Sequence, residues 1–360
     1  MFSRDQLLEI ISGRKRGIVA WVVRTGLSCL TPIYRWGVGS RNRRFDRGIA
    51  NQDRSVIKKA TIPVISVGNL TTGGTGKTPL VIWITKLLRQ SGRRVVLISR
   101  GYGAQAQENA ENSIGRNDEA LEMEDRLPGV PHLQDPDRFR MSQIAVQEHG
   151  SEIIVLDDGF QHRQLHRDLD IALIDATNPF GYDRLLPRGL LREPEASLSR
   201  ADFVILTRVD LVSNSDRDAI FKRIAKHAPE IPIATTKTEF THLLQTDGTQ
   251  QPISSISDQP VFVFCGIGNP ENFSSSLREI NLQICGQESF PDHHQFTGED
   301  LESLAAKANQ AGAGALLCTH KDLVKVGTKR IGSLPVYAIV IDVAFVSGEE
   351  EFAQALLQVK

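Results

Sequence analysis

The chain has 360 residues and carries 42 Lys and Arg against 43 Asp and Glu, for a formal net charge of −1. This length accommodates a sizeable core and most often two domains. The balanced charge gives no global field that favours nucleic acid, so no nucleic-acid partner is expected. Cys29, Cys265, Cys285 and Cys318 have no C-x-x-C spacing, which speaks against a zinc site and is typical of a reducing compartment.

The N-terminal segment differs in character from the rest of the chain. Residues 18–34 read IVAWVVRTGLSCLTPIY, and five arginines follow between residues 35 and 47. Arg24 interrupts this stretch, which is also short for a membrane span of about 20 apolar residues, and no signal cleavage site follows it. Its apolar face with Trp21 and Trp36, together with the basic flank, favours a helix lying on an anionic membrane surface. A helix packed on the protein's own core is the alternative.

A glycine-rich loop follows the first predicted strand, at residues 63–67, and precedes apolar residues with helical spacing between 80 and 88. Glycines let backbone N–H groups converge on a polyphosphate, a following Lys reaches the β- and γ-phosphates, and the next hydroxyl is a ligand for Mg²⁺. Thr71 stands where the common pattern has Gly, but the strand–loop–helix context is the one that the motif requires. The predicted nucleotide-binding residues are Thr71, Thr72, Gly73, Gly74, Thr75, Gly76, Lys77 and Thr78.

Beyond the loop, apolar runs alternate with polar helical stretches, which favours an α/β fold with a mostly parallel sheet flanked by helices. Residues 102–117 are predicted to form a loop, and the polar segment 237–257 a linker. Thr297 and Asp300 have the spacing of a capping box for a helix over 298–311. We expect a membrane-associating segment at 1–50, a P-loop NTPase-like domain at 51–255 and a smaller α/β domain at 256–360. Strands are predicted at 94–99, 152–156, 170–174, 203–206, 261–264, 315–317 and 336–341.

Paired carboxylates, Asp157 and Asp158, end the strand at 152–156. In P-loop proteins such a strand lies beside the loop, and its terminal Asp binds Mg²⁺ directly or through water. Thr78, Asp157 and Asp158 are therefore the predicted metal ligands. Arg100 follows another strand, where it either contacts an anionic ligand or forms a surface salt bridge.

Several segments occur in the order found in one known family. SVGNLTTGGTGKTP at 66–79, SRGYG at 99–103 and DDGFQH at 157–162 strongly resemble the tetraacyldisaccharide 4′-kinases, which act in lipid A biosynthesis in Gram-negative bacteria. The chain departs from the family pattern at Asn117 (usually Gly), Arg188 (usually Ala) and His320 (usually Glu). The further matches, which bring the resemblance to residues 15–345, are Asp118-Glu119, Leu186-Pro187, 191–194 (LREP), 265–268 (CGIG), 291–294 (PDHH) and 319–322 (THKD).

The resemblance implies phosphoryl transfer from ATP, with Mg²⁺, to the 4′-hydroxyl of a tetraacyldisaccharide 1-phosphate. The N-terminal helix would then dock on the cytoplasmic face of the inner membrane, where this lipid disaccharide is presented. The family's base, an Asp paired with a His, maps to Asp118 and His293, which join Lys77 as predicted catalytic residues. His162 is either a substrate-orienting or a structural residue. The predicted substrate contacts are Arg100, Gln161, His162, Arg192 and Glu193.

Other classes of protein share parts of this pattern. A P-loop ATPase or GTPase switch would have the same loop and carboxylates but would not need a lipid-facing N-terminus. A nucleotide-binding adaptor without activity would be free to lose Lys77 and Thr78. A kinase with another small-molecule acceptor is the strongest alternative, because a fold does not choose its substrate.

Overall fold

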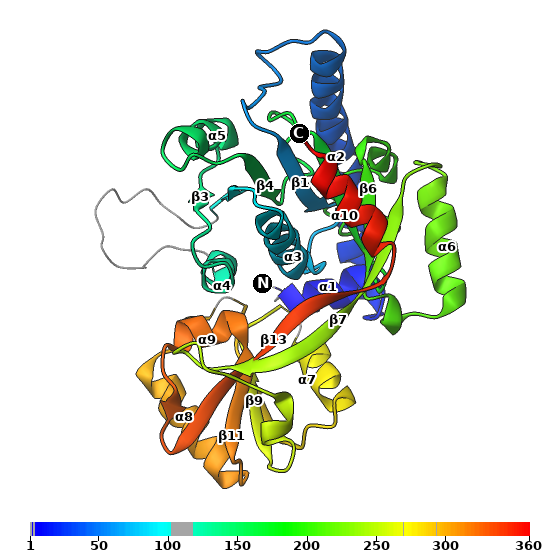
Figure 1. Cartoon of the computed structure of the whole chain (residues 1–360). Helices are drawn as coiled ribbons and strands as arrows, with labels where there is room; N and C mark the ends of the chain where they lie inside the picture. Colours follow the sequence, from blue (N-terminus) through cyan, green and yellow to red (C-terminus); the bar gives the residue numbers. More distant parts are fainter. Residues whose placement is uncertain (1, 3, 102–117, 269, 293) are drawn as a thin grey trace. The chain divides into compact units, whose positions relative to one another are not determined.

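The structure, a computed structural model, describes residues 2, 4–101, 118–268, 270–292 and 294–360. The chain forms two compact units (Figure 1). The first comprises Met1–Arg100, Gly129–Lys237 and Val343–Lys360, and the second comprises Gly101–Pro128 and Thr238–Asp342. The units therefore divide after residue 237 instead of the predicted 255, and the C-terminal residues belong to the first unit.

A parallel sheet with strand order β3-β2-β4-β1-β5-β6-β7 forms the centre of the first unit. β1 lies between β4 and β5, so that Val67 pairs with both Asp157 and Ile171. The central strands are buried apolar runs, as expected where helices cover both faces of a sheet. The strands are β1 (Val64–Asn69), β2 (Val95–Ser99), β3 (His132–Gln134), β4 (Ile153–Asp157), β5 (Leu169–Asp175), β6 (Phe203–Thr207) and β7 (Ile233–Leu244).

Helices of the first unit come from both ends of the chain (Figure 1). The last helix packs into the core, because the ring of Phe352 lies 5.7 Å from that of Trp83 and 4.8 Å from that of Phe203. The helices are α1 (Arg4–Ser12), α2 (Ile18–Ala50), α3 (Lys77–Gln90), α5 (Arg138–Gln147), α6 (Asn214–Ala225), α10 (Glu349–Gln358) and the 3₁₀ turns Gly181–Asp183, Glu195–Arg200 and Val209–Leu211.

Helix α2 is longer than the predicted apolar segment, with 33 residues. One row of side chains at a spacing of four, Tyr34, Val38, Asn42 and Asp46, faces the first unit, where it is buried or hydrogen-bonded. The opposite face exposes large apolar side chains instead. These are Ile18, Val19, Trp21, Val22, Leu30, Ile33 and Trp36.

In the second unit, the strands pair in parallel in the order β10-β9-β11-β13. Thr297 and Asp300 form the predicted capping box at the start of α8. Its elements are α4 (Asp118–Arg126), β8 (Gln250–Gln251), a 3₁₀ turn (Ile253–Ile256), β9 (Val261–Cys265), α7 (Pro270–Glu279), β10 (Ile284–Ser289), α8 (Gly298–Gln310), β11 (Ala315–Thr319), α9 (His320–Val326), β12 (Arg330–Ile331) and most of β13 (Leu334–Ser347).

The predicted linker over residues 237–257 is wrong for its first part, which continues strand β7 to Leu244. Leu243 and Leu244 are buried, and β8 pairs with this end of β7 in antiparallel fashion. The segment reads KTEFTHLL, and its β-branched and aromatic residues suit a partly exposed strand despite their polarity. The predicted loop at 102–117 lies outside the described residues.

Candidate active site

The glycine-rich loop lies between the end of β1 and the start of α3. Gly73 and Gly76 have φ angles of 115° and 82°, a backbone conformation that side chains disfavour, so the sequence needs glycine at both positions. Gly76 is the N-cap of α3, and Lys77 and Thr78 form its first turn. The helix therefore begins directly at the predicted phosphate site, where its free N–H groups and dipole favour an anion.

Lys77 belongs to a closed circuit of polar side chains, which we call the Lys77 cluster: Asn69, Lys77, Asp158, Gln161 and Arg192. The Lys77 ammonium donates to Asn69 Oδ1 at 3.0 Å and lies 3.4 Å from Asp158 Oδ1. Arg192 Nη1 donates to both oxygens of Asp158 at 3.0 Å and to Gln161 Oε1 at 3.1 Å. Gln161 Nε2 closes the circuit on the carbonyl oxygen of Asn69 at 3.0 Å.

Asp158 is the only carboxylate of the Lys77 cluster and neutralises one of its two cations. Burial opposes its ionisation, but the charges of Lys77 and Arg192 outweigh burial and lower the pKa of Asp158 below its usual range. The residue has a left-handed backbone, with φ of 51°, directly after the end of β4. The cluster thus holds a net positive charge beside the glycine-rich loop, which suits it to receive phosphate.

Segment 190–192 reaches the loop through main-chain hydrogen bonds. Thr72 N donates to Leu190 O at 2.8 Å, and Arg192 N donates to Leu70 O at 2.7 Å. These bonds fix Arg192 next to Asp158. The sequence predicted Arg192 as a substrate contact but not its pairing with Asp158. Asn69 was not predicted as a site residue at all. An Asn at the end of an apolar strand is a usable signal, because a buried amide needs hydrogen-bond partners, and Asn69 is fully buried.

The other predicted metal ligands are also on the elements that meet at the loop. Asp157 is the last residue of β4 and is buried, and Thr78 is buried in the first turn of α3. Hydroxyl and carboxylate oxygens are the donors that Mg²⁺ takes from proteins, alongside phosphate oxygens and water. The donor set of Thr78, Asp157 and Asp158 therefore fits this ion.

Glu193, a predicted substrate contact, is instead occupied by protein groups. Its side chain has 0% exposure and accepts hydrogen bonds from Asn42 Nδ2 at 2.8 Å, Arg200 Nη1 at 2.9 Å and Ser197 Oγ at 3.0 Å. Burial opposes its ionisation, but Arg200 and the hydrogen bonds outweigh burial and lower the pKa of Glu193. The carboxylate thus ties helix α2 to the first unit and has no exposed surface to offer a ligand.

We expect Glu193→Ala to lower the free energy of unfolding by about 3–5 kcal/mol, since it leaves the partly buried Arg200 charge without its carboxylate partner. Urea denaturation followed by circular dichroism measures the loss. Glu152→Ala is the matched control: it removes an exposed carboxylate paired with Arg94 at 3.1 Å and should cost less than about 1 kcal/mol. Equal losses in the two variants would contradict the role given to Glu193.

His162 is a neutral histidine in this setting. Burial, followed by the charges of Arg138 and Arg167, lowers its pKa to about 4, and the nearby Arg100 contributes in the same direction while Asp137 opposes it. Arg138 Nη1 lies 3.3 Å from His162 Nδ1, and because a guanidinium only donates, Nδ1 is the acceptor. His162 therefore keeps one N–H for other contacts and carries no charge near neutral pH.

This shift has a consequence for stability against pH. The unfolded chain binds a proton on His162 near pH 6.5 and the folded chain only near 4, so acidification favours unfolding. Between pH 7 and pH 5 this residue should cost the protein about 2 kcal/mol of stability, a loss that is complete below pH 4. His162→Gln should remove that part of the pH dependence in urea denaturation, whereas His149→Gln, at an exposed histidine, should leave it in place.

Of the two residues that the resemblance assigns to the base, Asp118 belongs to the second unit. Asp118 is the first residue of α4, but its side chain, like the whole of His293, lies outside the described residues. Helix α4 packs on α9, where His320 Nε2 lies 2.7 Å from Asp125 Oδ2. His320 is one of the departures from the family pattern, and in this chain it gains a carboxylate partner on the helix that begins with Asp118.

A strand that ends in a glycine-rich loop, a helix that opens with Lys-Thr, and a carboxylate at the end of the adjacent parallel strand define a P-loop nucleotide-binding protein. The chain matches the family model of tetraacyldisaccharide-1-P 4′-kinases over residues 23–360. The chain belongs to this family, whose enzymes phosphorylate a lipid in lipid A biosynthesis. The predicted family, activity and mostly parallel α/β fold are thus confirmed.

Relatives over most of the chain agree with this assignment. The tetraacyldisaccharide 4′-kinase of Anaeromyxobacter sp. (strain Fw109-5) is 36% identical and covers 90% of this chain and 88% of the relative. That of Geobacter metallireducens is 34% identical, covering 88% and 93%. The crystal structure of LpxK from Aquifex aeolicus in complex with ATP is 31% identical with a TM-score of 0.75, covering 94% of this chain and 99% of the other.

Proposed function

We propose that the Lys77 cluster is the phosphoryl-transfer site of this kinase, and that ATP is bound by the loop of residues 71–78. The observation that carries the proposal is the position of Lys77 and Arg192 around Asp158 at the end of the glycine-rich loop. In the resting protein Asp158 and Asn69 hold Lys77. Incoming β- and γ-phosphates compete for the same ammonium and guanidinium groups, so binding exchanges one anionic partner for another.

Thr78, Asp157 and Asp158 are the residues that would hold Mg²⁺. The ion, when bound, neutralises charge on the phosphates. The protein's own contribution is positional. The short loop between β1 and α3 fixes Thr78, and the pairing of β4 with β1 fixes Asp157, which Asp158 follows directly in the chain. Lys77 then stabilises the charge that builds on the transferring group and on the leaving oxygen of ADP.

We assign the proton transfer to Asp118, with His293 as its partner. The acceptor's 4′-hydroxyl oxygen forms the new bond to the γ-phosphorus while the bond to the bridging oxygen of ATP breaks, and the hydroxyl proton moves to the Asp118 carboxylate. An imidazole beside a carboxylate orients it. Support for the assignment comes from the family resemblance at Asp118-Glu119 and at residues 291–294.

Asp118→Asn tests this assignment. We expect turnover to fall about 10²–10⁴-fold, the usual range for loss of a general base, while ATP affinity stays within about twofold. Initial rates give turnover, and fluorescence titration with a labelled ATP analogue gives affinity. Glu124→Gln, on the same helix, is the control. Near-normal turnover in Asp118→Asn would mean that another group takes the proton.

Helix α2 gives the kinase a surface for its lipid acceptor. Its exposed apolar side chains include Ile33 at 67% and Trp36 at 71% exposure, an unusual concentration for a surface helix. Across the described parts of the chain, no helix combines the length and the apolar content that a membrane crossing requires. We assign α2 to reversible docking on the cytoplasmic face of the inner membrane, with the acceptor lipid held in the same bilayer.

The experiment that tests the whole proposal uses γ-labelled ATP, Mg²⁺ and micelles that contain a tetraacyldisaccharide 1-phosphate. Label on the lipid, dependent on Lys77, is the expected result. Release of free phosphate without labelled lipid would favour the ATPase switch. Label on a different acceptor but not on this lipid would favour a kinase of another small molecule.

A further inference from the structure

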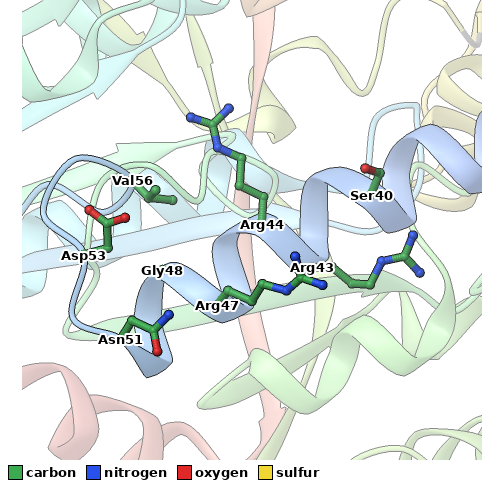
Figure 2. A pocket seen from close by; sticks show the side chains of 8 residues that line it. All are labelled: Ser40, Arg43, Arg44, Arg47, Gly48, Asn51, Asp53 and Val56. Atoms are coloured by element: carbon green, nitrogen blue, oxygen red, sulfur yellow. The ribbon is translucent and has the colours of Figure 1, made fainter.

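A basic cavity of about 440 Å³ lies at the C-terminal end of helix α2, away from the Lys77 cluster in sequence and in its lining (Figure 2). Arg43, Arg44 and Arg47 project from the helix, and Asn51 and Asp53 belong to the turn that follows it. The cavity lining as a whole is Ser40, Arg43, Arg44, Arg47, Gly48, Asn51, Asp53 and Val56.

The three guanidinium groups of this cavity have no carboxylate within 4 Å among the described residues, whereas Arg41 of the same helix pairs with Glu193 at 3.4 Å. The one carboxylate in the lining, that of Asp53, accepts hydrogen bonds from the backbone N and hydroxyl of Ser55. The cavity therefore carries a surplus of two positive charges, with five donors on each arginine side chain available to an anion.

The cavity continues the exposed apolar face of α2. Ile33, Trp36, Ser40, Arg43 and Arg47 follow one another at intervals of three or four residues, so they form one stripe along the helix. Val38 and Asn42, which are anchored to the first unit, lie on the other side. A surface that receives Trp36 therefore also meets the arginines, about 10–17 Å further along the helix axis.

The geometry points to a binding site for the phosphate of an anionic membrane phospholipid in this cavity. The inference rests on the proposed docking of α2 on the membrane, and it names the lipid group that the helix binds there. A soluble anion would make no contact with the exposed Ile and Trp side chains next to the arginines. A phospholipid can contact both, because its acyl chains meet the apolar side chains and its phosphodiester meets the arginines. Arginine suits this partner because its planar fork donates two parallel hydrogen bonds to phosphate oxygens.

Vesicle flotation of the full-length protein tests the site. The probes are phosphatidylcholine vesicles with and without phosphatidylglycerol, at fixed ionic strength. Basic side chains near an anionic surface contribute about fivefold each, so the triple variant Arg43→Gln/Arg44→Gln/Arg47→Gln should bind phosphatidylglycerol vesicles about a hundredfold more weakly. Its binding to pure phosphatidylcholine should be unchanged. The control removes the same number of cations from the region of α6, by Arg217→Gln, Lys222→Gln and Lys226→Gln, and should lose much less.

A single substitution tests the same site in case the triple variant does not fold. Ser40 is exposed and lines the cavity, so Ser40→Glu places a carboxylate three and four residues before Arg43 and Arg44. Ser40→Glu should weaken binding to phosphatidylglycerol vesicles about fivefold, and Ser40→Gln should not. If the α6 control and the triple variant lose the same vesicle affinity, the proposed site is wrong, because binding would then depend only on the total charge of the protein.

Two further measurements separate this inference from the proposed kinase site. Inorganic phosphate, titrated into the wild-type protein, should bind no more tightly than to the triple variant; a difference would assign the cavity to a soluble anion. Turnover in neutral detergent micelles should stay normal in the triple variant, and a loss there would place the arginines on the acceptor substrate instead. If the wild-type protein also shows no turnover in micelles, the proposed kinase function is wrong. The flotation experiment would still test whether the cavity binds anionic phospholipid.

Discussion

Replacement of Lys77 by alanine should lower turnover about a thousandfold, as is common when a charge that stabilises a transferring phosphoryl group is lost. Asp158 would retain Arg192, which donates to both of its oxygens, so the carboxylate stays paired and the fold should remain intact. The effect should therefore fall on the chemical step and on ATP affinity, not on stability.

The measurement is transfer of label from γ-labelled ATP to the lipid in micelles, with thermal unfolding as the check on folding. Lys86→Ala is the matched control, because Lys86 is exposed on the same helix, α3. A Lys77→Ala enzyme that keeps a tenth of normal turnover would show that the glycine-rich loop does not hold the transferring phosphate.

Asp158→Asn should produce two effects of opposite direction. Turnover should fall about a thousandfold, because a metal-binding carboxylate is lost. The affinity for nucleotide without Mg²⁺ should rise severalfold, because Lys77 and Arg192 no longer have an anion to release before they meet the phosphates. This rise in metal-free nucleotide affinity would show that Asp158 competes with the phosphates for Lys77 and Arg192. A carboxylate that only binds the metal would produce no such rise.

Rates over a range of Mg²⁺ concentrations and equilibrium binding of a fluorescent ATP analogue in EDTA measure the two effects. Asp218→Asn, an equal change at an exposed position of α6, should alter neither. If metal-free binding weakens in Asp158→Asn, the resting contact between Asp158 and Lys77 does not compete with nucleotide, and the exchange described above is wrong.

The sequence predicted the phosphate loop because its signals are local. Glycine at residues 73 and 76 is required by the backbone angles there, and a buried strand on one side and a helix on the other complete the pattern. The carboxylates at the end of β4 were predicted for the same reason. Strand ends in a parallel sheet meet at one edge, so topology alone brings Asp158 near Lys77.

Contacts between distant segments were not predictable in this way. The place of Arg192 depends on hydrogen bonds between residues 190–192 and 70–72, and the buried Glu193 is bonded by Asn42 of the distant helix α2. Neither the periodicity nor the motif spacing of a sequence indicates which distant segments come into contact. The linker prediction over 237–257 failed for a related reason, since the polar residues of β7 are specified by neighbouring strands more than by their own hydrophobicity.

The return of helix α10 to the first unit has a consequence for how the protein is made. Phe352 completes an aromatic cluster with Trp83 and Phe203, more than a hundred residues upstream of it. A ribosome at about 5–20 residues per second delivers these partners many seconds before Phe352. The nascent first unit therefore exposes apolar rings while the second is still being translated. Stalled or prematurely terminated chains should be substrates for chaperones and proteases, although they contain the entire ATP-binding loop.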